Sequence, residues 1–255
     1  MVTTGYPWDS AKKTEVIDLE HNLEDSNVIC EDLNDFPMEI QAAVSANLES
    51  LPIICGGRFH NGSYHSSDKC FKYMDGGWQH FATMINRRAY ATGIVYGNAL
   101  HIFGGFDYDT WTKLQSSETI NIDGSSTEGP KLPTPIYVHA IAAINSAVSI
   151  ISGGYTNTNS YSRLTWYFNH ATHEFQPGPS LLEDRGYHSS GTIIDENTKE
   201  RIVIIAGGRN DNGFFDSTEM LINGKWVTGK SHKYFVDLSI FCRFGYSKSN
   251  YHICM

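Results

Sequence analysis

The sequence predicts an all-β protein assembled from repeated small antiparallel sheets. Three observations carry this prediction. A hydrophobic run that ends on two glycines recurs along the chain, the copies are about 50 residues apart, and no window has the period of an amphipathic helix. The copies read IICGG at 53–57, HIFGG at 101–105, IISGG at 150–154 and IIAGG at 204–208, with a fainter VTTG at 2–5.

Four short strands are predicted in each repeat, and the double glycine ends the second of them. An alternating run such as YATGIVYG at 90–97 supplies the first strand, and a run such as SETINI at 117–122 supplies the third. Both are rich in the β-branched and aromatic residues of half-buried strands. The fourth segment follows a polar turn and carries an aromatic residue in three repeats, which we expect to be structural: Trp78, Phe175 and Trp226.

Composition excludes several classes of function. The 255 residues include 40% hydrophobic and 18% charged residues, so a sizeable core can be buried. The net charge is −9 and basic residues cluster only in pairs, whereas a nucleic-acid surface needs concentrated positive charge. No apolar run approaches the ~20 residues that span a bilayer, so membrane insertion is not expected. The first residues lack a secretory signal, which favours the cytoplasm; a truncated piece of a longer chain would permit an extracellular location.

The apolar run, double glycine, Thr- or Glu-bearing third strand and following Trp resemble the kelch-repeat β-propeller family over nearly the whole chain. The resemblance implies one domain, 1–255, with four-stranded blades at about 38–84, 85–133, 134–182 and 183–230. A fifth blade would close the ring with two strands each from 1–37 and 231–255. Because VTTG competes for one of these places, a fragment of a six-bladed propeller is the alternative.

The doubled glycines are expected to be structural. At the end of the second strand the backbone turns sharply and packs closely, which a Cβ would obstruct. A phosphate-binding loop would need a following helix, and none is predicted. The residues concerned are Gly56, Gly57, Gly104, Gly105, Gly153, Gly154, Gly207 and Gly208.

The loops that follow the double glycines are predicted to share one face of the propeller. They concentrate the aromatic residues, Asn and Arg that suit a recognition surface. The candidate partner-binding residues are Tyr6, Trp8, Arg58, Phe59, Phe106, Tyr108, Tyr155, Arg209 and Asn210. Arg58 and Arg209 are suited to a bidentate contact with a carboxylate or phosphate, or else they only cap the interface between blades.

Further arginines, histidines and cysteines of the sequence have the residue types that metal or ligand sites use. Arg88 and Arg185 precede first strands and are expected either to bond backbone carbonyls between blades or to meet a ligand. His170 and His173 are interpreted as solvated turn residues, so no metal site is predicted. Among five cysteines without a CxxC pair, buried free thiols are favoured and a Cys30–Cys70 disulfide is the alternative.

The sequence therefore predicts a non-catalytic interaction module that binds a partner protein or peptide on its loop-bearing face. It carries no GxSxG nucleophile elbow, and no cofactor is implied. The alternative is a secreted or surface propeller, similar in architecture to galactose oxidase, that recognises carbohydrate or acts on a sugar. No grouping of Tyr, His and Cys that would supply copper ligands is recognisable.

Overall fold

The computed structural model describes residues 2–3, 14–16, 31–32, 34–195 and 198–229. Their regular structure consists of strands β1 to β27, with no helix among the described residues. Accordingly, no helix in this part of the chain is long and apolar enough to cross a membrane. The all-β prediction is confirmed.

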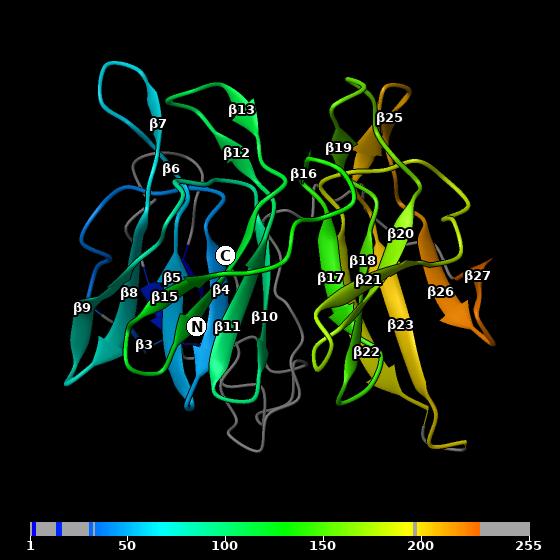
Figure 1. The fold of residues 1–255 in the computed structure, drawn as a ribbon, viewed down its shortest axis with the longest axis horizontal. Helices are drawn as coiled ribbons and strands as arrows, with labels where there is room; N and C mark the ends of the chain where they lie inside the picture. Colours follow the sequence, from blue (N-terminus) through cyan, green and yellow to red (C-terminus); the bar gives the residue numbers. More distant parts are fainter. Residues whose placement is uncertain (1, 4–13, 17–30, 33, 196–197, 230–255) are drawn as a thin grey trace.

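Four antiparallel sheets of four strands each dominate the molecule (Figure 1). The first contains β4 (Val44–Leu48), β5 (Leu51–Cys55), β8 (Lys69–Met74) and β9 (Gly77–Thr83). The second contains β10 (Thr92–Tyr96), β11 (Ala99–Phe103), β14 (Ser117–Asn121) and β15 (Ser126–Glu128). The third contains β17 (Ala140–Ala143), β18 (Val148–Ser152), β20 (Thr165–Asn169) and β21 (Glu174–Pro177). The fourth contains β22 (Ser189–Ile194), β23 (Arg201–Ala206), β26 (Thr218–Ile222) and β27 (Lys225–Thr228).

Each double glycine is followed directly by a strand of a short two-stranded ribbon. The ribbons lie together at one end of the sheets, at the top of Figure 1. They pair β6 (Arg58–His60) with β7 (Tyr64–Ser66), β12 (Phe106–Asp107) with β13 (Thr112–Lys113), β16 (Ile136–Tyr137) with β19 (Tyr155–Thr156), and β24 (Arg209–Asn210) with β25 (Gly213–Phe214). The loops predicted to share a face therefore do so.

The N-terminal residues form a sheet of three strands, where the sequence predicted two. These strands are β1 (Val2–Thr3), β2 (Thr14–Val16) and β3 (Glu31–Asp32), in that order. The fainter repeat VTTG thus supplies a strand of its own, which pairs with the expected third strand. Residues 231–255, predicted to complete this sheet, lie outside the described residues.

The first three double glycines pack on the segment that leads into the next sheet. Gly57 N donates to Arg88 O at 2.8 Å, and the same bond recurs from Gly105 N to Ile136 O. Gly56 has a φ of 67°, and a Cβ there would lie 2.4 Å from Arg88 O. Positive φ and the lack of space both require glycine.

A chain of backbone hydrogen bonds links the segments just before the first strands. Tyr90 N donates to Ala42 O at 2.8 Å, Val138 N to Tyr90 O at 3.0 Å, and Tyr187 N to Val138 O at 2.9 Å. All four residues have a positive φ, between 51° and 57°. The first strands of neighbouring sheets, β4, β10, β17 and β22, also contact one another in that order. This arrangement fits a β-propeller.

The hydrophobic core lies between neighbouring sheets. One cluster joins the first and second sheets through residues such as Ile53 and Leu100, and similar clusters fill the next two interfaces. The fourth-strand aromatics contribute to this packing. Trp226 is buried and its Nε1 donates to Pro179 O at 2.9 Å; Phe175 packs on Phe168, with ring centroids 4.8 Å apart. Trp78 packs edge-on against Phe36 at 5.1 Å.

A disulfide joins Cys55 to Cys70, so the predicted Cys30–Cys70 pairing is wrong, as are free thiols at these two positions. Cys55 ends β5 and Cys70 stands directly opposite it in β8, with a Cα–Cα distance of 4.0 Å. Both residues are fully buried. Cys30 lies outside the described residues.

Two buried arginines bond backbone carbonyls. Arg88 Nη1 donates to Gly104 O at 2.6 Å, and Arg185 Nη1 donates to Gly207 O at 2.9 Å. Each guanidinium also pairs with a buried glutamate of the third strand, Glu118 or Glu219. The acceptors lie in each arginine's own repeat, so these guanidinium groups do not make the predicted bonds between blades. They fix the segment before the first strand to its own sheet, and with Arg88 1% and Arg185 0% exposed neither is open to a ligand.

Candidate functional site

Seven tyrosines gather where the ribbons and the segments before the first strands meet. We call this surface the tyrosine face: Tyr64, Tyr90, Tyr108, Tyr137, Tyr155, Tyr161 and Tyr187. Successive rings are in contact, with centroids 5.1 to 6.4 Å apart. Because these residues come from all four repeats, the face spans the end of the molecule that carries the ribbons.

Arg58 is a cation at the first-repeat side of the tyrosine face. Its Cζ lies 5.0 Å from the ring centroid of Tyr64 and 5.4 Å from that of Tyr90. Its Nη1 donates to the Tyr108 hydroxyl at 3.4 Å, and its Nε and Nη2 donate to Gln41 Oε1 at 3.1 and 2.9 Å. Aromatic rings on two sides hold the guanidinium by cation–π contacts.

Gln41 adds a donor beside this guanidinium. The residue is 7% exposed, and its Nε2 has no hydrogen-bond partner among the described residues. A buried amide N–H without a partner is costly, so such a group commonly meets a water or a ligand. Arg58 and Gln41 together can therefore bind a group that carries acceptor oxygens.

The hydroxyls of Tyr90 and Tyr137 remain protonated at neutral pH. Burial raises the pKa of Tyr90 well above its ordinary value, although Arg58 opposes the shift. Burial, with a smaller contribution from neighbouring tyrosines, raises the pKa of Tyr137 to about 12. These hydroxyls can donate hydrogen bonds to a ligand, while their rings offer apolar surface.

Some of the predicted site residues lie in the tyrosine face and others lie outside it. Arg58 and Tyr108 come together in the tyrosine face, and Phe106 is buried beneath it against Tyr108 and Tyr137. Tyr155 also belongs to the face, with its hydroxyl bonded to Asn159 O at 2.9 Å. Phe59 lies apart and stacks on His65.

Of the two fourth-repeat candidates, Arg209 contacts the tyrosine face and Asn210 is buried. Arg209 lies over the Phe214 ring at 5.2 Å and interacts with Tyr161. Asn210 is buried, and its Nδ2 donates to Asp184 Oδ1 at 3.2 Å. Tyr6 and Trp8 lie outside the described residues.

Sequence reasoning missed the tyrosines that precede the first strands. Tyr90 and Tyr187 stand two residues after Arg88 and Arg185, at equivalent places in their repeats. Their rings nevertheless contact each other at 5.8 Å although the residues are far apart in the chain. The repeat spacing was a usable signal for this contact, because equivalent positions converge when sheets are arrayed around an axis.

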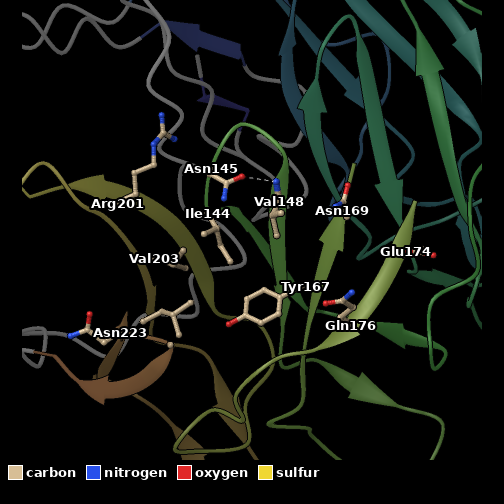
Figure 2. Close-up of a pocket in the computed structure, with 12 residues that line it drawn as sticks. Ile144, Asn145, Val148, Tyr167, Asn169, Glu174, Gln176, Arg201, Val203 and Asn223 are labelled. Carbon is tan, nitrogen blue, oxygen red and sulfur yellow. Dashed lines mark hydrogen bonds between the residues drawn. The ribbon is translucent and has the colours of Figure 1, made fainter. Parts of the chain in front are cut away.

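A cavity of about 450 Å³ lies between the third and fourth sheets, near the strand ends opposite the ribbons. Figure 2 shows the Tyr167 ring beside Gln176, with Ile144 and Val203 nearby. The other polar residues that line this cavity are Asn145, Asn169, Glu174, Arg201 and Asn223. Asn145 is engaged in its own turn, since its Oδ1 accepts from Val148 N at 2.9 Å.

A smaller cavity of about 330 Å³ lies between the second and third sheets and is lined by three histidines. His170 was predicted to be solvated, and this is wrong: it is 4% exposed and stacks on Tyr96 at 4.4 Å. Burial, with His101 and His173 as smaller causes, lowers the pKa of His170 to about 4. No group of three metal-binding side chains suited to an ion occurs among the described residues.

Comparisons with known proteins report on the fold. No family model and no curated protein matches the chain. A solved structure described as "Structure of YjhT" is similar over 82% of this chain and 76% of that one, with a TM-score of 0.69 and 10% sequence identity. At this identity the likeness establishes a shared fold alone.

Proposed function

We propose that the chain is a kelch-type β-propeller that acts as an interaction module and binds a partner peptide across the tyrosine face. The observation that carries this proposal is the unbroken contact of seven tyrosines from four repeats, three of which, Tyr64, Tyr90 and Tyr108, contact Arg58. Tyrosine supplies large, rigid, amphipathic contact area at low entropic cost, and Tyr and Arg dominate the binding energy of many interfaces. The proposal concerns binding and depends on no reaction.

Arg58 and Gln41 define the chemistry of the partner. Both present donors, and Arg58 is charged, so the site suits a peptide carboxylate, from Asp, Glu or a chain end. The surrounding rings suit apolar side chains next to that carboxylate. We therefore expect acidic peptides with flanking aromatic or aliphatic residues.

A ring of five blades accommodates the described sheets. The linked segments at Ala42, Tyr90, Val138 and Tyr187 support a radial array. The three-stranded N-terminal sheet leaves a place for one further strand, which residues 231–255 would supply. A piece of a six-bladed array is the alternative.

A peptide array tests the binding proposal. Immobilised acidic, neutral and basic peptides with flanking aromatics are probed with the wild type and with Arg58→Ala, Tyr108→Ala and Arg201→Ala. We expect acidic peptides to bind the wild type, at least about tenfold weaker binding of the first two variants, and unchanged binding of Arg201→Ala. Absence of binding to acidic peptides, or equal binding of all variants, contradicts the proposal.

The cavity of Figure 2 favours carbohydrate as the second candidate ligand. An aromatic ring at Tyr167 beside the amide of Gln176 combines an apolar platform with hydrogen-bonding groups, as a sugar requires. A glycan array with the wild type, Tyr167→Ala and Arg58→Ala separates the candidates. Glycan binding lost only in Tyr167→Ala would favour carbohydrate recognition.

A further inference from the structure

A serine, a histidine and an aspartate form a hydrogen-bonded relay at the edge of the tyrosine face. Ser63 Oγ lies 2.9 Å from His65 Nε2, and His65 Nδ1 lies 2.7 Å from Asp109 Oδ1. Ser63 and His65 come from the β6–β7 hairpin, and Asp109 comes from the turn between β12 and β13. Residues of two neighbouring repeats thus meet, which sequence order alone does not suggest.

The aspartate is held in place from several directions. Its Oδ2 accepts from Ser66 N at 3.0 Å, and Arg87 Nη1 lies 3.4 Å from its Oδ1. Its own backbone N donates to Asp107 Oδ1 at 2.9 Å, which fixes the turn. Partial burial acts to raise the pKa of Asp109, but His65, Ser66 and Arg87 lower it overall, so the carboxylate is ionised at neutral pH.

The two hairpins are also joined by the buried Ser66. Its Oγ donates to Phe106 O at 3.1 Å and accepts from Tyr108 N at 2.9 Å. These bonds hold the strand that carries His65 against the turn that carries Asp109. The relay is therefore built on a fixed junction between the first and second repeats.

The carboxylate determines the tautomer of the histidine. An ionised carboxylate only accepts, so in the neutral imidazole His65 Nδ1 carries the proton and Nε2 is the acceptor for the Ser63 hydroxyl. This is the arrangement in which a histidine can act as general base toward a serine, a constellation recognised by geometry and not by sequence position.

We infer that Ser63, His65 and Asp109 form a nucleophilic site that hydrolyses carboxylic esters, an activity that goes beyond the proposed peptide binding. Ser63 Oγ attacks the ester carbonyl carbon while its proton passes to His65 Nε2. The tetrahedral adduct collapses, the bond to the alcohol oxygen breaks, and the alcohol leaves with that proton. Water then attacks the acyl-serine with His65 as base, which releases the carboxylic acid and restores Ser63.

The surroundings indicate the class of ester. The Phe59 ring stacks on His65, with centroids 5.5 Å apart. This ring borders the relay, while Ser63 is exposed at the hairpin tip. A small ester with an aryl or other flat apolar group fits this setting.

A fluorophosphonate reporter and p-nitrophenyl acetate test the inference on the full chain. The Ser63 oxygen should displace fluoride from phosphorus, giving one labelled peptide that contains Ser63. In Ser63→Ala we expect no label at this position. In His65→Ala we expect both labelling and ester hydrolysis to be at least about 100-fold slower than in the wild type. Ser180→Ala and His80→Ala, exposed serine and histidine variants outside the relay, should behave as the wild type.

Asp109 acts through His65 and is a positioning residue. Asp109→Asn should lower kcat for the ester by about 100-fold with KM unchanged, because the histidine then loses its oriented tautomer. Failure of folded wild type to label at Ser63, equal labelling after heat denaturation, or undiminished rates in His65→Ala would overturn the inference. Peptide binding is measured separately with Arg58→Ala, so failure of one proposal leaves the other distinguishable.

Discussion

At the scale of single residues, two equivalent buried positions are filled by an ion pair in one repeat and by apolar side chains in another. In the second repeat, Arg88 lies against Glu118, which stands opposite Ile102 in the sheet. In the first repeat the equivalent positions hold Ile40 and Phe71, and both belong to one apolar cluster. A buried ion pair and an apolar pair are thus interchangeable within one fold, as desolvation arguments expect.

This comparison predicts strong non-additivity. Glu118→Phe leaves the Arg88 charge buried and unpaired, so the free energy of unfolding should fall by about 3–5 kcal/mol. The double variant Arg88→Ile, Glu118→Phe recreates the pair of the first repeat and should recover most of that loss. Urea unfolding of the wild type, both single variants and the double variant measures the coupling. A double variant as unstable as the sum of the singles would contradict the interpretation.

Buried histidines predict a loss of stability in acid. Burial, with Arg185 and His139 as smaller causes, lowers the pKa of His188 to about 3, and His170 is lowered to about 4. The pKa of a histidine in the unfolded chain is about 6.5. At pH values between this pKa and the lower pKa values of the folded protein, the unfolded chain binds more protons than the folded one, so the free energy of unfolding falls as the pH falls. The free energy of unfolding from urea titrations should be lower at pH 5 than at pH 7 by roughly 2 kcal/mol for each of the two histidines. The difference should shrink in His170→Gln and persist in His80→Gln; equal pH dependence in all three proteins would argue against it.

At the scale of the elements, the double glycine is a junction between sheets. Gly104 has a φ of 59°, and a Cβ there would lie 2.4 Å from Ile136 O in the segment that leads to the third sheet. Gly97 has nearly the same φ, 57°, but has no atom within 4 Å of such a Cβ. A comparison of Gly97 with Gly104 therefore distinguishes the cost of the left-handed backbone from the cost of the missing space for a Cβ.

Alanine at the two positions should therefore give different losses. Gly97→Ala carries only the cost of a left-handed conformation, about 1–2 kcal/mol. Gly104→Ala should cost several kcal/mol because the sheets must also move apart. Thermal and urea unfolding of the two variants provide the comparison. Equal losses would show that conformation alone explains the glycines.

The elements also mark how far sequence reasoning reaches. Glycine spacing predicted the four sheets because each repeat must bury its faces against its neighbours. The predicted strands place Cys55 at the end of one strand and Cys70 at the start of the next, so antiparallel pairing of these strands was enough to predict that the two cysteines stand opposite each other. The burial of His170 could not be predicted, because Tyr96, which covers it, belongs to another sheet.

At the scale of the whole molecule, the chain of hydrogen bonds through Ala42, Tyr90, Val138 and Tyr187 raises the question of closure. In a closed ring every sheet has two neighbours, and each interface is covered like that formed by Ile53 and Leu100. An open array would present a bare sheet face at each end, which favours association between copies. Closure by the chain's own ends therefore predicts a monomer.

Removal of residues 231–255 tests closure. If they complete the N-terminal sheet, a chain of residues 1–230 should unfold at lower urea concentration and associate, because an interface between sheets is left uncovered. Light scattering after size exclusion and urea unfolding measure both effects, and a synthetic peptide of residues 231–255 added in trans should restore the monomer. A truncated chain as stable and as monomeric as the full one would instead favour the six-bladed alternative, in which these residues begin a further blade and contribute little to the four sheets before them.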